Sequence, residues 1–486
     1  MSQATKLRAV ADVDSPGLLS RVRVADGLGK LIFVLLLALI SFTAIPFGTA
    51  EPWWKAFFVC AVFSLCVLWI IEGLLRNAWV NNLNGVGRIL LPVLALALFS
   101  FLQTIHLGNF IRPQNAANTI AQAGWNSISA DPYQPRFFVF QLLALAVAGL
   151  LVHRYASTER RWRTLINVVI AVAVVSALFG ILRQTMQHSV GFGLPIMGPD
   201  QGYGQFINRN HFAFLMEMGF GLALGLVAGG GVRRDQGLIY LAAILPLWTG
   251  LVLCNSRGGL IAMVAQIVAA VLLFSSVTQR ESASTASSRA AKLFRSKTAQ
   301  LALIVILVGG VIFGTLWMGG DQLAARIAAT GSELPSARVE SRDGVRRNEV
   351  WATTWRMFAA NPIVGVGFGA YWARVPEFHD ASGAMTPQQA HNDYLELLAS
   401  GGLVGLAIGA WFVLSLFRSA RENLRLPNRF GRAAVFGAII AIAGVAVHSL
   451  VDFGLQILIN ALIFTTLIVI VTSKPRWAEE PTKNYA

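Results

Sequence analysis

The run LIFVLLLALISFTAIPFG, residues 31–48, has the length and apolar character of a helix that crosses a lipid bilayer. Runs of similar length recur along the whole chain of 486 residues, of which 55% are hydrophobic and only 13% are charged. Backbone polar groups inside a bilayer must bond within their own segment, so such runs form helices. The sequence therefore predicts an all-α polytopic membrane protein.

About twelve such runs are predicted to be transmembrane helices, with boundaries accurate to about 2 to 4 residues. They cover residues 31–48, 54–75, 89–106, 136–153, 164–184, 210–229, 237–254, 258–276, 300–319, 401–417, 433–450 and 454–473. The predicted organisation is a tail of residues 1–30, helices 1–9 within 31–319, one large loop of 320–400, helices 10–12 within 401–473, and a tail of 474–486.

Lysine and arginine are distributed unevenly between the two sides of this arrangement. If the N-terminus is cytoplasmic, the tails and even-numbered loops hold 26 of the 39 lysines and arginines, and the opposite side holds 13. Seven of those 13 lie in the large loop, and long loops do not count in the positive-inside rule. Both termini are therefore predicted to be cytoplasmic and the large loop extracytoplasmic. The same distribution explains the net charge of +15 without a nucleic-acid partner.

The large loop has the sequence pattern of an ordered segment. VWATTWRMFAA (350–360) has helical periodicity, and NPIVGVGFGAYW (361–372) contains the proline and glycines typical of turns. A second helix is predicted to begin at Asn392 and to stop at Gly401 and Gly402.

His391 stands at the end of this loop, in the stretch HNDYLELLASGGLVGL. An imidazole takes up a proton near neutral pH, so a histidine at a membrane boundary beside Asp393 and Glu396 is a candidate general base. The alternative is that His391 is a helix-capping or interfacial residue. Asp393 and Glu396 are a minimal ligand set for Mg²⁺, and no metal or other cofactor is predicted.

Arg209 and Arg257 each stand at the outer beginning of a predicted span. A guanidinium binds a phosphate through two points, and a helix N-terminus adds donors and a positive dipole. The two arginines together are candidates for binding a diphosphate. The alternative is that each is an interfacial anchor that extends to lipid headgroups.

The residues around the two arginines favour a polar pocket over lipid. Asn208, Asn210 and His211 surround Arg209, and two glycines follow Arg257. Amides and an imidazole suit a polar pocket, and glycines allow a close approach of the backbone. Asn208, Asn210 and His211 are therefore secondary site candidates.

Further secondary candidates lie elsewhere in the outer segments. His379 belongs to the large loop, and Arg136 ends the outer stretch WNSISADPYQPR (125–136). His448 and Asp452 lie at the beginning of the last span. The alternative for His448 and Asp452 is a structural hydrogen bond, because buried polar groups in membranes seek partners.

The large loop carries a run of arginines that can attract an anionic glycan or phosphates: Arg338, Arg342, Arg346, Arg347 and Arg356. The alternative is local ion pairing, because carboxylates are interleaved with them: Glu333, Glu340, Asp343 and Glu349.

Several of these motifs, in this order, resemble the membrane O-antigen ligase and O-antigen polymerase superfamily. They are WNSISADPYQPR (125–136), NRNHFAF (208–214), NSRGG (255–259), P-x-x-G-x-G-F from Pro362, H-N-x-x-L-x-x-L-x-x-x-G-x-x-G from His391, and HSLVDFGLQI (448–457). The resemblance extends over residues 30–473 and includes the number of spans and the large loop between spans 9 and 10.

This resemblance implies a multi-pass glycosyltransferase of the bacterial inner membrane, inverting and metal-independent, with a periplasmic active site. It would take a glycan from an undecaprenyl diphosphate carrier and join it to a hydroxyl of a glycan, lipid A-core or protein acceptor. His391 would be the base for the acceptor, on a catalytic helix in the periplasmic loop, and Arg209 and Arg257 would bind the diphosphate. Alternatives are a protein O-oligosaccharyltransferase of the same superfamily and, in another class, a glycan flippase or secondary transporter.

Overall fold

The computed structural model describes residues 16–77, 83, 85–105, 127–129, 131, 133–186, 202–281, 301–302, 304–306, 308–310, 313, 347–379 and 387–480. All the regular structure named in these residues is helical, apart from an isolated bridge between Tyr203 and Phe206. The prediction of an all-α fold is therefore confirmed.

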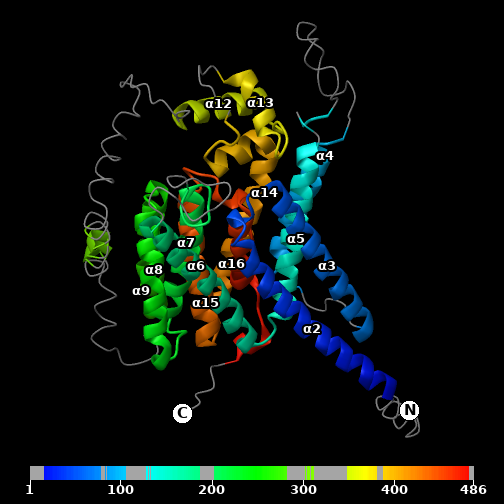
Figure 1. Cartoon of the computed structure of the whole chain (residues 1–486), viewed down its shortest axis with the longest axis vertical. Coiled ribbons are helices and arrows are strands. Elements are labelled where there is room, and N and C mark those ends of the chain that lie inside the picture. The colour runs from blue at the N-terminus through cyan, green and yellow to red at the C-terminus, as the bar shows by residue number, and fades with distance from the viewer. Residues whose placement is uncertain are drawn as a thin grey trace.

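Eight described helices are long and apolar enough to cross a membrane, as expected of a multi-pass membrane protein (Figure 1). They are α2 (Pro16–Thr43), α3 (Pro52–Arg76), α5 (Tyr133–Tyr155), α6 (Glu159–Met186), α7 (Arg209–Ala228), α9 (Arg257–Glu281), α14 (Asp393–Asn423) and α15 (Arg429–His448). Three shorter apolar helices are α4 (Gly87–Leu102), α8 (Gly237–Leu253) and α16 (Leu458–Thr472). The predicted number of twelve is not established by these helices, and most of the predicted span 300–319 lies outside the described residues.

The first helix begins earlier than the span predicted from residue 31. Helix α2 starts at Pro16, and its early turns expose Arg21, Arg23 and Lys30 to solvent. The prediction placed the boundary where the sequence becomes apolar. A helix, however, can continue beyond the apolar run into polar sequence, as α2 does before residue 31. Proline is tolerated at the start of α2 because backbone N–H groups in the first turn of a helix have no hydrogen-bond acceptor within the helix.

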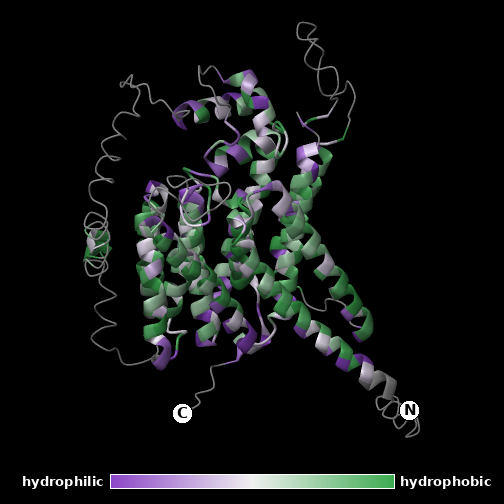
Figure 2. Ribbon diagram, viewed as in Figure 1, coloured by the Kyte–Doolittle hydropathy of each residue, from purple (hydrophilic) through white to green (hydrophobic). Residues whose placement is uncertain are grey.

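Contacts between helix termini divide the bundle into two ends. Glu72 at the end of α3 accepts a hydrogen bond from Arg154 at the end of α5, so these termini lie together. We call this the Glu72 end. At the opposite end the turn after α15 contacts the beginning of α7, where Asn210 donates to Asp452. We call this the Asp452 end. Figure 2 shows hydrophobic residues along the helices between the ends and hydrophilic residues concentrated at them.

The tightest packing in the bundle joins α7 to α15. A Cβ atom added to Gly225 would lie 2.1 Å from the Cα atom of Gly437, so glycine is required at this crossing. Close approach of backbones through small residues is the usual way in which helices associate in lipid. The same close packing continues toward the Asp452 end, where a Cβ atom on Gly221 would lie 2.6 Å from the Cα atom of Ala441, so α7 and α15 run side by side.

Two short helices, α12 (Arg347–Ala360) and α13 (Tyr371–Phe378), lie beyond the Asp452 end, above α14 in Figure 1. The turn between them packs on α14, where the amide of Val366 donates to the carbonyl of Ala399 at 3.0 Å. The large loop is thus ordered in its described part, residues 347–379 and 387–400.

The helix predicted to stop at Gly401 and Gly402 continues after an interruption. Gly402 has φ 60° and ψ −157°, which breaks the helical path, and α14 then resumes and ends at Asn423. The amide of Leu403 donates instead to the carbonyl of Pro362 at 2.8 Å. Gly401 and Gly402 were interpreted as the end of the helix. The turn at Pro362 instead supplies a hydrogen-bond acceptor at the interruption, and the helix continues beyond it.

Candidate active site

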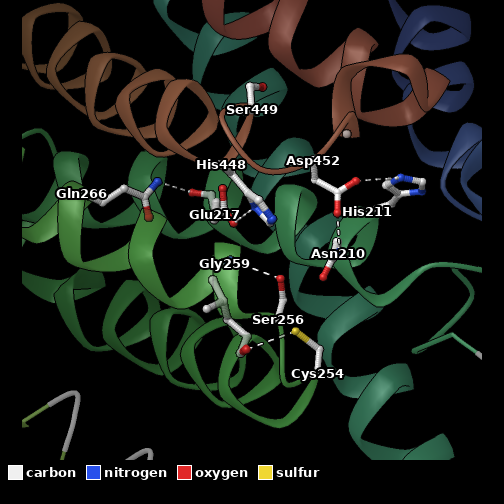
Figure 3. Close-up of polar contacts among 12 residues, drawn as sticks. Asn210, His211, Glu217, Cys254, Ser256, Gly259, Gln266, His448, Ser449 and Asp452 are labelled. Carbon is white, nitrogen blue, oxygen red and sulfur yellow. Dashed lines mark hydrogen bonds and ion pairs between the residues drawn. The ribbon is translucent and has the colours of Figure 1, made fainter. Parts of the chain in front are cut away.

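Several polar side chains at the Asp452 end of the bundle contact Asp452, and Figure 3 shows its carboxylate between Asn210 and His211. Asp452 lies in the turn between α15 and α16, and its side chain is fully buried. Oδ2 accepts hydrogen bonds from the Asn210 side chain and from Nη2 of Arg347, the latter at 3.3 Å. Oδ1 accepts the amide of Phe453 at 2.9 Å. Residues from three distant parts of the sequence therefore meet at one carboxylate.

Two histidines face the same carboxylate. Oδ1 of Asp452 lies 3.6 Å from Nδ1 of His391 and 3.8 Å from Nε2 of His211. The Phe453 ring contacts both imidazoles edge to face, with centroids 4.8 Å from His391 and 4.7 Å from His211. Both nitrogens are buried and lack a hydrogen-bond partner within the described residues. The histidines are thus held at ion-pair distance from Asp452 by packing.

Asp452 is a charged group despite its burial. Burial alone would raise its pKa, but the contacts with His391 and His211 and the hydrogen bond from the Phe453 amide outweigh burial. The pKa of Asp452 therefore lies below the usual range for an aspartate, and the site keeps a permanent negative charge at neutral pH.

His391 is positioned by backbone geometry and does not cap the following helix. The cap of α14 is Asn392, whose side-chain oxygen accepts the amides of Tyr394 and Leu395, each at 3.0 Å. The helix-cap alternative for His391 is therefore wrong. His391 itself has φ 50°, in the left-handed region, which turns its side chain away from the helix axis. Its side chain is 34% exposed, so the imidazole joins the buried Asp452 to the surface.

Asp393 and Glu396 hold α14 against the turn that follows α15. Oδ2 of Asp393 accepts the Ser449 hydroxyl at 2.8 Å. Glu396 accepts the Ala390 amide at 2.9 Å and the Gln456 side chain at 2.7 Å. Within the described residues, no three His, Cys, Asp or Glu side chains are grouped to bind a metal ion. The contacts of these two carboxylates are those of structural anchors.

Arg209 and Arg257 are the first residues of α7 and α9, and both helices begin at the Asp452 end. Asn208 caps α7, and its side chain accepts the amide of Asn210 at 2.9 Å. Arg209 is exposed and Arg257 is half-buried. Arg209 directly precedes Asn210, which donates to Asp452, and Gly258, which follows Arg257, packs against the His448 ring. Two helix N-termini, each beginning with an arginine, therefore lie near Asp452.

The glycines after Arg257 are pressed against a buried acid and base pair. Nδ1 of His448 lies 2.6 Å from Oε1 of Glu217, and both side chains are buried. A Cβ atom on Gly258 would lie 2.5 Å from the His448 ring, and one on Gly259 would lie 2.9 Å from the Cβ atom of Ala213, one turn before Glu217 on α7. This explains the two glycines by close packing, and Figure 3 shows His448 and Glu217 pointing toward each other.

Gln266 extends the same buried group. Its side-chain nitrogen donates to the backbone carbonyl of Glu217 at 2.8 Å, which ties α9 to α7. His448 thus makes a structural hydrogen bond, as its alternative interpretation supposed, but to Glu217 and not to Asp452.

The described arginines of the large loop differ in their contacts. Arg347 pairs with Asp452 and so joins the candidate site. Arg356 donates to the carbonyl of Phe378 at 2.7 Å, a contact between α12 and the end of α13. The carboxylate partner of Arg347 is Asp452, so local ion pairing within the loop does not account for its position. Arg338, Arg342 and Arg346 lie outside the described residues.

The contacts found for Arg136 and His379 are with residues outside the Asp452 group. Arg136 is exposed at the start of α5, with its guanidinium carbon 5.7 Å from the centre of the Tyr133 ring. Nδ1 of His379 lies 3.1 Å from the Thr353 hydroxyl, between α13 and α12. The contact of Arg136 is on the surface of the protein, and the contact of His379 packs α13 against α12.

Sequence reasoning missed Glu217 and the role of Arg347. Glu217 is the single acidic residue of α7, within an otherwise apolar run. An ionisable residue inside a span is a signal for function or for a buried partner, so it was detectable. Nothing in the sequence distinguishes Arg347 from the neighbouring arginines of the large loop. Its partner, Asp452, is distant in the sequence, so only the structure shows that they pair.

Comparison with known proteins places this geometry in a family context. Residues 241–410 match the family model described as O-antigen ligase, a range that contains Arg257 and His391 and is narrower than the predicted 30–473. The exopolysaccharide production protein ExoQ of Rhizobium meliloti is 24% identical over 306 residues, which are 60% of this chain and 60% of that protein. The resemblance predicted from the motifs is thereby confirmed, and residues 241–410 carry the sequence pattern of the O-antigen ligase family.

Proposed function

We propose that this protein is a membrane glycosyltransferase that transfers a glycan from an undecaprenyl diphosphate carrier to an acceptor hydroxyl at the periplasmic face. The observation that carries the proposal is the meeting of His391, a partly exposed imidazole, with the buried carboxylate of Asp452. An imidazole beside a fixed carboxylate at the surface of an apolar bundle suits removal of a proton from a sugar hydroxyl.

His391 is the general base in this proposal. Its Nδ1 faces Asp452, so an imidazole that carries its proton on Nδ1 has Nε2 as its basic nitrogen. Nε2 takes the proton of the acceptor hydroxyl as the oxygen attacks the anomeric carbon. Asp452 stabilises the resulting imidazolium. The separation of 3.6 Å is longer than a hydrogen bond, and such contacts commonly tighten when substrate binds.

Arg209 and Arg257 act on the leaving group. As the acceptor oxygen bonds to the anomeric carbon, the bond from that carbon to the diphosphate oxygen breaks, and the carrier diphosphate keeps the bonding electrons. Two guanidinium groups at helix N-termini neutralise this charge in the transition state. The single displacement inverts the anomeric configuration, and the arginines take the charge-neutralising role that a metal ion has elsewhere.

A glycan is the acceptor that the comparisons favour. The name of the relative from Rhizobium meliloti refers to exopolysaccharide production. We therefore propose a polymerase, whose acceptor is a growing glycan chain, ahead of a ligase that uses lipid A-core or a transferase that uses protein.

The proposal is tested by transfer from a purified undecaprenyl-diphosphate-linked glycan to a defined acceptor by the purified chain. Asp452→Asn removes the charge that faces His391 and keeps the size of the side chain. We expect it to lose at least about 100-fold in rate, the lower part of the range for positioned acid-base groups. Glu377→Gln is the matched control, because Glu377 is an exposed carboxylate that pairs with Arg374, outside the Asp452 group. A wild-type rate for Asp452→Asn would contradict the proposal.

A second candidate, a glycan flippase or secondary transporter, is favoured by one observation. Glu217 and His448 form a buried pair inside the apolar bundle, and transporters often place ionisable pairs there. The two candidates differ in what accumulates in a strain that lacks the protein. Mass analysis will find short carrier-linked glycans outside the cytoplasm for a missing polymerase, and untranslocated ones for a missing flippase.

A further inference from the structure

A cavity of about 480 Å³ lies at the Glu72 end, away from Asp452. It is open to the surface and is lined by α2, α3, the end of α5, the turn that precedes α6 (Glu159–Met186) and the first turn of α6. The residues that line it are mainly charged or hydroxyl-bearing: Asp26, Gly29, Lys30, Glu72, Arg76, Arg154, Tyr155, Ser157, Thr158 and Arg161. The candidate active site makes no use of this cavity.

Two of the four cations in the cavity are neutralised by its two carboxylates. Arg76 forms ion pairs with Asp26, at 2.6 Å, and with Glu72. Arg154 donates to the other oxygen of Glu72 at 2.7 Å. Glu72 is buried, so these contacts are needed to hold its charge in place. They form the structural base of the cavity.

The other two cations, Lys30 and Arg161, have no carboxylate within ion-pair distance in the described part of the chain. Arg161 donates to the carbonyl of Tyr155 at 2.9 Å, which orients its guanidinium without neutralising it. Lys30 is exposed on α2. In addition, Nε of Arg154 is a buried donor that lacks an acceptor among the described residues. The cavity therefore has an excess of two positive charges and an unused donor.

We propose that this cavity binds the phosphate of an anionic lipid headgroup. Phosphate oxygens accept bonds from guanidinium and ammonium groups together, and the hydroxyl of Ser157 adds a neutral donor. The volume lies in the range of small-ligand sites, about 300 to 1,000 Å³. The cavity also lies at the ends of apolar helices, where the headgroups of a surrounding bilayer are found.

The surface beside Lys30 favours a lipid over a soluble phosphate. Leu31 and Val34, the next turn of α2, are 47% and 59% exposed, and Leu74 near the end of α3 is 63% exposed. Exposed aliphatic side chains on helices of this length face acyl chains in a bilayer. A lipid with its phosphate between Lys30 and Arg161 can lay its chains along these residues.

The test is retention of lipid by the full chain, purified from mixed vesicles of phosphatidylglycerol and phosphatidylcholine and measured by native mass spectrometry. Wild type is expected to retain phosphatidylglycerol. Lys30→Ala with Arg161→Ala should bind it about 100-fold more weakly, since each of the two lost contacts to a charged group is worth a factor of roughly ten. Lys30→Glu alone is a second variant, because no internal contact of Lys30 is lost by the change.

Arg21→Ala with Arg23→Ala is the matched control, because these exposed arginines lie on α2 outside the cavity lining. Loss of the lipid from the cavity variants but not from the control supports the proposal. Equal retention by all of them overturns the site. Displacement of the lipid by millimolar inorganic phosphate overturns the headgroup assignment in favour of a soluble phosphate. Glycan transfer is not the readout, so this test is independent of the proposed function.

Discussion

Nδ1 of His391 lies 3.6 Å from Oδ1 of Asp452, which joins the end of the large loop to the turn between α15 and α16. The other oxygen of Asp452 pairs with Arg347 at the start of α12, so both described parts of the loop converge on one carboxylate. A buried charge with several partners is costly to disrupt, and it fixes the loop relative to the bundle. The position of His391 thus depends on the whole arrangement of the Asp452 end.

Arg209→Lys and Arg257→Lys are each expected to lower the rate of glycan transfer by roughly 30- to 1000-fold. An ammonium keeps the charge but cannot make the planar two-point contact with phosphate. Loss of such a contact in a dry site costs on the order of 2 to 4 kcal/mol of transition-state stabilisation. Initial rates at saturating acceptor measure the effect. Folded, membrane-inserted Lys variants with normal turnover would show that both residues are interfacial anchors.

The depressed pKa of Asp452 predicts a dependence of stability on pH. Its interactions stabilise the fold fully above the ordinary aspartate pKa of ~3.9, and this stabilisation is lost as the pH falls toward the lower folded-state pKa. Asp452→Asn has no such charge to lose. The difference in melting temperature between wild type and Asp452→Asn should therefore narrow between pH 5 and pH 3, measured in detergent. A constant difference over that range would contradict the assigned charge.

The buried pair of Glu217 and His448 is expected to serve structure. Glu217→Ala leaves a buried imidazole without its partner and should destabilise the protein by about 3 to 5 kcal/mol. Glu217→Gln keeps a hydrogen-bonding group and should retain both the fold and most of the transfer activity. Thermal unfolding and transfer rates of the two variants measure this. A well-folded Glu217→Gln protein that has lost glycan export but not transfer would instead favour the transporter function.

The large loop is expected to be extracytoplasmic, as the distribution of lysine and arginine predicts. Single cysteines at Ser332, in this loop, and at Ser284, in a predicted inner loop, test it in a background without native cysteines. An impermeant maleimide added to intact cells should label the cysteine at 332 and not the one at 284. The reverse pattern would invert the topology and remove the proposed active site from the periplasm.

Much of the helical bundle could be predicted from the sequence because apolar run length is a local property. Helix α7 lies within one residue of the span predicted at 210–229, and α15 lies within four residues of the span predicted at 433–450. The start of α2 at Pro16 was not predictable from apolarity, and neither was the joining of the helix predicted from Asn392 to the span predicted at 401–417. The early turns of α2 are polar and exposed, and the interruption of α14 depends on a hydrogen bond to Pro362. The pattern of apolar residues contains neither kind of information.

Most residues of the candidate site could be selected from the sequence, but which of them contact one another could not be predicted. His391, Asn210, His211 and Asp452 were all selected from the sequence, and the structure brings them together. Their partners lie far apart in the chain, so only tertiary packing assigns Asp452 to His391. Glu217 was the clearest omission, because an acidic residue inside a predicted span is itself a signal, although its partner His448, 231 residues away, could not be assigned from the sequence.

The central claim is that His391 removes the proton of the acceptor, and purified His391→Ala and His391→Asn proteins test it most directly. Neither change should prevent membrane insertion or binding of the carrier-linked glycan, because donor binding is assigned to Arg209 and Arg257. Glycan transfer should fall by ~10² to 10⁴-fold, the usual contribution of a positioned base. EDTA treatment of the wild type should leave transfer intact. Transfer by either variant at a rate near that of the wild type would contradict the role of His391, and loss of wild-type transfer in EDTA would contradict the metal-free mechanism.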